Sequence, residues 1–179
     1  NGFPCKEGRE INVFFNSKLP KKIDFFVWNL NESYNQILNT NLGFSNPVFC
    51  ISHNRLNQTP GHEIAHNISF WMNNDNIRTK FINEGIGVCF DQQKNEKLKI
   101  AQKTYKTNQI DIKEIWRNQT KLNDDILYPI SGAFVNFLIE YDKEKFLKLT
   151  ENQTYENAIK IYGANIVDLI DDFIKKLEK

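Results

Sequence analysis

The stretch His62-Glu63-Ile64-Ala65-His66 decides how this sequence is interpreted. On an α-helix, residues four apart lie one above the other, so the imidazoles of His62 and His66 point toward one place. Glu63 lies about 100° around the helix axis from His62, beside a metal ion bound there rather than on it. The stretch therefore predicts a helix that presents two metal ligands and one carboxylate suited to proton transfer.

A third ligand is predicted further along the chain. Glu84 lies 18 positions after His66, within Phe81-Ile82-Asn83-Glu84-Gly85. This spacing leaves room for a turn and for the middle of a second helix packed against the first. Two histidines and one glutamate leave a fourth zinc position open for water, as catalytic zinc sites require. We therefore predict one Zn²⁺ ion per chain, bound by His62, His66 and Glu84, with Glu63 as the general base.

The composition limits the classes of protein to consider. The 179 residues are 40% apolar and 13% aromatic, which excludes a disordered chain. A net charge of +1 gives no electrostatic reason to expect binding to nucleic acid or to an anionic membrane. No apolar run approaches the roughly 20 residues of a transmembrane segment. We expect a globular protein, and the sequence carries no signal for its oligomeric state.

The start of the chain and its cysteines bear on the compartment. The sequence begins at Asn1 without Met or a signal peptide, as expected of a mature secreted product or a trimmed chain. We therefore expect an extracytoplasmic protein that is secreted, periplasmic or surface-anchored. Cys5, Cys50 and Cys89 are too few and too scattered for a disulfide framework, although one pair can form. A buried thiol is expected for Cys89, which follows Glu84 in an apolar stretch.

The first fifty residues are predicted to form strands around one helix. Residues 11–15 and 23–28 are β-branched and aromatic, and residues 47–52 continue this pattern after a proline at their start. Residues 32–38 suit a short helix. The third of these strands either pairs with an extended peptide substrate, as an edge strand can, or is a plain central strand.

From Pro60 onward the sequence has helical periodicity. Pro60 and Gly61 suit the start of a helix, because proline is tolerated in a first turn. Further helices are predicted over about 77–91, 96–105, 128–141 and 167–177. The expected fold class is α+β, with a small sheet-rich part over residues 1–55 and a mostly helical part over 56–179. Together the two parts are expected to form a single domain, residues 1–179.

The sequence resembles the gluzincin zinc metallopeptidases, specifically the small minigluzincin or peptidase-MA-like members. Three segments carry the resemblance: His-Glu-Ile-Ala-His at 62–66, Phe-Ile-Asn-Glu-Gly-Ile-Gly-Val-Cys-Phe-Asp at 81–91, and Tyr-Pro-Ile-Ser-Gly-Ala-Phe-Val-Asn-Phe-Leu at 128–138. Residues 155–162 look like the closing segment of these families, so the resemblance covers roughly residues 45–179. The resemblance implies a zinc-dependent peptidase that acts on a peptide or protein substrate.

The resemblance also implies roles for two residues outside the ligand set. Tyr128 occupies the position of the family's stabilising tyrosine, so its hydroxyl is expected to stabilise the oxyanion. His53, the remaining histidine, is the alternative donor. Asp91 lies seven positions after Glu84 and is a candidate acceptor for the second N–H of a ligating histidine. The alternative for Asp91 is a surface acid at the end of its helix.

One departure from the family pattern affects specificity. No Gly-x-Met-Glu-Asn segment precedes the zinc helix, and the one methionine, Met72, follows it. We therefore expect an endopeptidase, or a peptidase without a defined end preference, rather than an aminopeptidase. The alternative function is a catalytically silent zinc-binding module. Glu63 argues against this alternative, because a zinc ion without a catalytic role has no use for that carboxylate.

Overall fold

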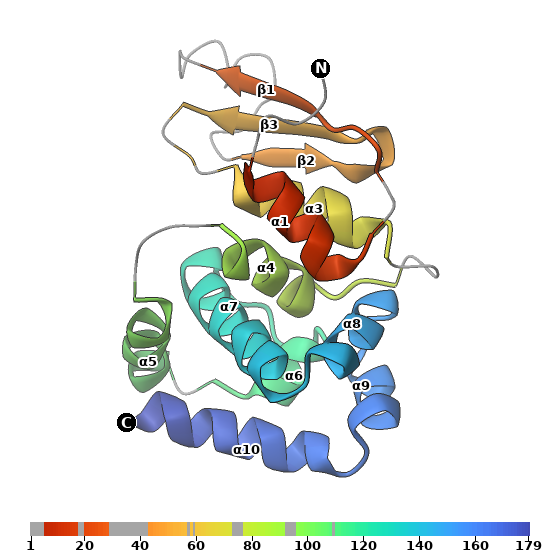
Figure 1. The fold of residues 1–179 in the computed structure, drawn as a ribbon. Helices are drawn as coiled ribbons and strands as arrows, with labels where there is room; N and C mark the ends of the chain where they lie inside the picture. Colours follow the sequence, from red (N-terminus) through yellow and green to blue (C-terminus); the bar gives the residue numbers. More distant parts are fainter. Residues whose placement is uncertain are drawn as a thin grey trace. The chain divides into compact units, whose positions relative to one another are not determined.

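The structure, a computed structural model, describes residues 6–17, 20–28, 43–56, 58, 60–72, 77–91, 96–108 and 110–179. These residues are mostly helical, with one three-stranded sheet near the N-terminus (Figure 1), which confirms the predicted α+β class. The chain divides into two compact units. The first comprises residues 1–72 and 90–93, and the second comprises residues 73–89 and 94–179. No helix in the described ranges is long and apolar enough to cross a membrane.

In its described residues, the first unit combines the sheet with two helices that pack on each other. Its elements are α1 (Lys6–Phe15), β1 (Asp24–Trp28), β2 (Phe44–Asn46), the 3-10 helix η1 (Pro47–Phe49), β3 (Ile51–Arg55) and α3 (Gly61–Phe70). Strand β3 lies in the centre of the sheet, parallel to β1 and antiparallel to β2. Helix α3 packs on β2 and β3, and α1 packs on α3. The helix that carries both histidines therefore belongs to the same unit as the sheet.

The prediction of a strand over residues 11–15 is wrong, because these residues lie in α1. Ile11 and Phe15 are buried, whereas Val13 between them is 74% exposed. In a strand all three would share one face, since side chains alternate with a period of two. Burial at positions i and i+4 is the helical pattern instead. Aromatic and β-branched composition suggested a strand, and the packing of α1 on α3 overrides it.

The prediction for residues 47–52 is correct only in its last part. Residues 47–49 form η1, and Cys50 follows in a left-handed conformation with φ of 55°, so the strand begins at Ile51. Because β3 has a neighbour on each side, it is a plain central strand and is not free to pair with a substrate. The predicted strand over 23–28 is confirmed as β1. The helix predicted over 32–38 lies outside the described residues.

The second unit is helical in its described part. Its elements are α4 (Lys80–Cys89), α5 (Lys97–Asn108), α6 (Ile112–Trp116), α7 (Asp124–Tyr141), α8 (Lys143–Glu151), α9 (Tyr155–Tyr162) and α10 (Asn165–Glu178). Helix α7 contacts α4, α5 and α8, while α10 contacts α5 and α9. The four helices predicted from periodicity are confirmed as α4, α5, α7 and α10. Helix α7 begins earlier than predicted. The acidic side chains of Asp124 and Asp125 lie in its first turn, where the positive end of the helix dipole stabilises them.

An aromatic cluster forms the core of the second unit. The ring of Trp116 is fully buried and lies 5.4 to 6.2 Å, between centroids, from the rings of Phe81, Phe134 and Tyr155. The indole Nε1 of Trp116 donates to the backbone carbonyl of Gln153 at 2.7 Å. The cluster joins α4, α6, α7 and the start of α9, so it fixes the helix that carries Glu84 within this unit.

Candidate metal centre

His62 and His66 form the centre of the candidate site on α3. His62 is half-buried and His66 is 7% exposed. Their Nε2 atoms lie 3.0 Å apart, with the rings nearly perpendicular at 81°. Two imidazole nitrogens bound to one tetrahedral zinc ion, each at about 2.05 Å, are about 3.3 Å apart. The separation of the two Nε2 atoms is close to that value, so the pair fits a shared metal ion.

Glu63, the proposed base, is also buried. It is 7% exposed, and its carboxylate lies against the backbone at Gly43, just before β2. A Cβ atom built on Gly43 would lie 2.7 Å from Oε1 of Glu63. The carboxylate therefore occupies space that any side chain at position 43 would enter. Glu63 is not a solvated glutamate on the helix surface.

The start of α3 lies against the segment that contains Asp91. A Cβ atom built on Gly61 would lie 2.0 Å from the carbonyl oxygen of Phe90 and 3.3 Å from Cα of Asp91. Glycine is thus required for the backbones of these two segments to approach so closely. Asp91 is 7% exposed, so it is not a surface acid. It lies next to the residue that precedes His62, and its role as an acceptor for a histidine N–H stays a prediction.

Glu84 lies in the middle of α4 and is half-buried. Its neighbour Gly85 allows α4 to approach α7, because a Cβ atom there would lie 2.5 Å from Cγ2 of Val135 and 2.6 Å from the carbonyl oxygen of Ser131. The glycine after the glutamate therefore has a packing function. Within the described part of the chain, His62, His66 and Glu84 form a group of side chains that can hold a metal ion, each offering one donor atom.

Tyr128 lies in the second turn of α7 and is half-buried. Its carbonyl oxygen accepts a hydrogen bond from Oγ of Ser131 at 3.1 Å. The carbonyl of Ser131 in turn faces Gly85, so Tyr128 lies about one helical turn from the contact between α4 and α7. Tyr128 and Glu84 thus belong to neighbouring parts of the same unit, and the oxyanion role of Tyr128 stays a prediction.

His53, the alternative donor, lies in the middle of β3. Its neighbour Ser52 is buried toward α3, where its Oγ accepts a hydrogen bond from Asn67 at 2.8 Å. Because side chains alternate along a strand, His53 points to the opposite face of the sheet. There its ring stacks on Phe26 and Phe44, with centroids 5.0 and 5.9 Å away. The face of the sheet that carries His53 is therefore not the face on which α3 packs.

A hydrogen bond determines the tautomer of the neutral His53 ring. Nε1 of Trp28 donates to Nδ1 of His53 at 3.1 Å, so Nδ1 is an acceptor and the proton of the neutral ring is on Nε2. Burial lowers the pKa of His53 below its usual value of 6.5, because a charged imidazolium is less well solvated there. These contacts account for His53 without a catalytic role.

Cys50 and Cys89 do not form a disulfide with each other. Cys89 is half-buried rather than buried as expected, and its Sγ lies 3.9 Å from Oδ1 of Asn136. Cys5 lies outside the described residues. Of the described cysteines, neither Cys50 nor Cys89 belongs to the candidate metal group.

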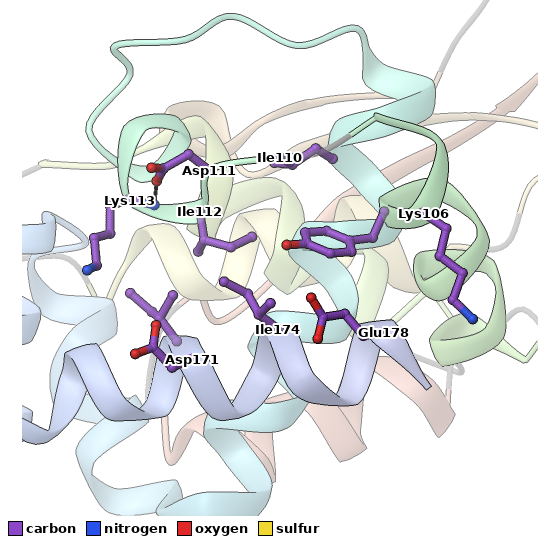
Figure 2. Close-up of a pocket in the computed structure, with 10 residues that line it drawn as sticks. Lys106, Ile110, Asp111, Ile112, Lys113, Asp171, Ile174 and Glu178 are labelled. Carbon is purple, nitrogen blue, oxygen red and sulfur yellow. Dashed lines mark hydrogen bonds between the residues drawn. The ribbon is translucent and has the colours of Figure 1, made fainter.

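A pocket of about 650 Å³ in the second unit is lined by both apolar and charged side chains. Figure 2 shows Ile112 and Ile174 forming part of its apolar wall, with Lys106, Asp171 and Glu178 among the charged groups around it. Its lining includes none of the predicted site residues. None of the sequence motifs at 62–66, 81–91 and 128–138 contributes a residue to this pocket.

Comparisons with protein-family models, curated proteins and solved structures found no match to this chain. The functional interpretation therefore depends on the motif at residues 62–66 and on the geometry of the residues around it.

Proposed function

We propose that this chain is a zinc-dependent peptidase of the gluzincin type, which hydrolyses peptide bonds in a peptide or protein substrate. The observation that carries the proposal is the convergence of the Nε2 atoms of His62 and His66, 3.0 Å apart, on a helix whose Glu63 is buried beside them. Two convergent imidazoles with an intervening buried carboxylate are the arrangement expected of a metal-dependent hydrolase.

His62 and His66 would hold the metal ion through Nε2, and Glu84 would supply a carboxylate oxygen. Nitrogen and oxygen donors in this ratio suit zinc, which accepts both and takes three protein ligands in catalytic sites. When bound, zinc lowers the pKa of water to about 7 and polarises a carbonyl oxygen. Asp91, buried beside the first turn of α3, is suited to accept an N–H from a ligating histidine and so to fix its orientation.

Glu63 is proposed to act as general base and then as general acid. Its carboxylate accepts a proton from the attacking water and passes that proton to the nitrogen of the leaving amine. Burial beside Gly43 fixes the place of this carboxylate, and proton transfer requires a base held within hydrogen-bond reach of the proton. Tyr128 is proposed to donate its hydroxyl proton in a hydrogen bond to the oxyanion that forms during attack. An extracytoplasmic location stays a prediction from the sequence.

Hydrolysis of a mixed peptide library by the purified chain, with and without a chelator, tests this function. The account expects cleavage that the chelator abolishes and that added zinc restores. Glu63→Gln should retain the metal and the fold but lose about 10²-fold or more in rate, because an amide does not accept the proton. Zinc binding without any cleavage by the unmodified chain would favour the alternative of a catalytically silent module.

A further inference from the structure

Asn67 is a buried polar residue on α3 whose side chain forms hydrogen bonds to both α3 and β3. Its side chain is fully buried, one residue after the second histidine and one helical turn after Glu63. Its Nδ2 group donates to Oγ of Ser52 at 2.8 Å and to the carbonyl of Ile51 at 3.3 Å, both on the central strand β3. The same group lies 3.0 Å from the carbonyl of Glu63, and because it carries two hydrogens, one of them is shared between two of these three acceptors. Asn67 thus joins the turn of the helix that bears Glu63 to the centre of the sheet.

The orientation of the Asn67 amide follows from its partners. The carbonyls of Ile51 and Glu63 accept hydrogen bonds and do not donate them, so only Nδ2 can face them. This orientation leaves Oδ1 of Asn67 buried without a hydrogen-bond partner among the described residues. A buried acceptor without a partner is unfavourable for stability. The Asn67 amide therefore links α3 to β3 and does not only fill the core.

The group that Asn67 positions is Glu63. Residues four apart share one helix face, so Asn67 and Glu63 both face the sheet, Asn67 over β3 and Glu63 beside Gly43 at the start of β2. Rotation or translation of α3 on the sheet would move the Glu63 carboxylate away from this place. The histidine pair is less sensitive, because its geometry is set within α3 itself.

We propose that Asn67 is a positioning residue for Glu63, which it holds in place through Ser52 and the carbonyl of Ile51. The proposal rests on the peptidase function proposed above. A displacement of about 1 Å of a catalytic group can cost about 10²-fold in rate. Loss of the Asn67 contacts should therefore affect turnover more than metal binding or substrate binding.

The test compares Asn67→Ala and Ser52→Ala with Ile68→Val, which trims a fully buried side chain of the same helix without touching these hydrogen bonds. Ser52→Ala is the milder change and removes only one acceptor. In both Asn67→Ala and Ser52→Ala, kcat should fall about 10–100-fold while KM and zinc affinity stay within about twofold of the unmodified chain. The kcat of the double variant should be no lower than that of Asn67→Ala alone, because both substitutions break the same connection between α3 and β3. Ile68→Val should leave kcat unchanged.

A second readout does not depend on activity. The carboxyl-carbon chemical shift of Glu63, assigned with Glu63→Gln, should change in Asn67→Ala and Ser52→Ala but not in Ile68→Val. An unchanged shift, or kcat and zinc affinity that fall together, would overturn the positioning role of Asn67. Absence of chelator-sensitive hydrolysis in the unmodified chain would instead refute the peptidase function, and the chemical shifts would still decide whether Asn67 positions Glu63.

Discussion

Gly43 and Glu63 approach each other so closely that a Cβ atom at position 43 would lie 2.7 Å from the Glu63 carboxylate. The atom in the way is the end of a flexible side chain, so Glu63 can move aside without disturbing the backbone. We therefore expect the free energy of unfolding of Gly43→Ala to lie within about 0.5 kcal/mol of that of the unmodified chain, as for most substitutions away from the core. Its kcat should nevertheless fall about tenfold or more, because the base is displaced. Steady-state kinetics with urea denaturation distinguish these effects, and an unchanged kcat would contradict the placement of Glu63.

Gly61→Ala, unlike Gly43→Ala, should lower the stability of the fold. A Cβ atom there would meet the carbonyl oxygen of Phe90 at 2.0 Å, and backbone atoms do not move aside as a side chain does. We expect a loss of about 1–3 kcal/mol in the free energy of unfolding, the usual cost of overpacking. Urea denaturation followed by circular dichroism measures it. Equal stability of Gly61→Ala and the unmodified chain would mean that the segment containing Asp91 does not lie against the start of α3.

Tyr128→Phe should reduce turnover more than substrate affinity. The proposed hydrogen bond exists only when the oxyanion forms, so its loss lowers kcat and kcat/KM together. Removal of one such donor typically costs about 10²–10³-fold in rate. His53→Ala is the matched control, because His53 stacks on Phe26 on the face of the sheet away from α3. If His53→Ala abolishes hydrolysis while Tyr128→Phe does not, the role of Tyr128 is wrong.

The stability of the chain should depend on pH through His53. Burial lowers the pKa of the folded imidazole below its usual 6.5, so the unfolded chain binds the proton more readily. The free energy of unfolding should therefore decrease as the pH falls below about 6.5 and level off below the folded pKa. NMR titration of His53 measures the shift directly. His53→Gln should lose this part of the pH dependence, and a folded pKa at or above 6.5 would contradict the burial argument.

The sequence predicted the helices better than the sheet, for a physical reason. The helix with the histidines and α10 have apolar residues at helical spacing over ten or more positions, a signal that survives in any packing. Residues 11–15 contain the same residue types as a strand, but in the structure they belong to α1, which packs on α3. The turn at Cys50 depends on a left-handed backbone conformation that no residue type at that position signals.

The candidate site likewise has some features that the sequence predicts and others that it does not. The histidine pair follows from the spacing of four residues, because both imidazoles belong to one helix. The contacts of Asn67 with Ser52 and of Glu63 with the backbone at Gly43 join residues that are distant in sequence. No motif marks them, since they depend on how α3 packs on the sheet. In the sequence, Asn67 is conspicuous only as the start of Asn67-Ile68-Ser69, a glycosylation triplet whose asparagine is fully buried.

Metal content is the most direct test of the central claim, that His62, His66 and Glu84 hold one zinc ion. The unmodified chain, purified without chelator and dialysed against zinc-free buffer, should retain about one zinc ion per chain by mass spectrometry of the metals. His66→Ala and Glu84→Ala should each retain far less, while His53→Ala, which removes a histidine from the other face of the sheet, should retain as much as the unmodified chain. Equal zinc content in all four proteins, or none in the unmodified chain after reconstitution, would contradict the assignment.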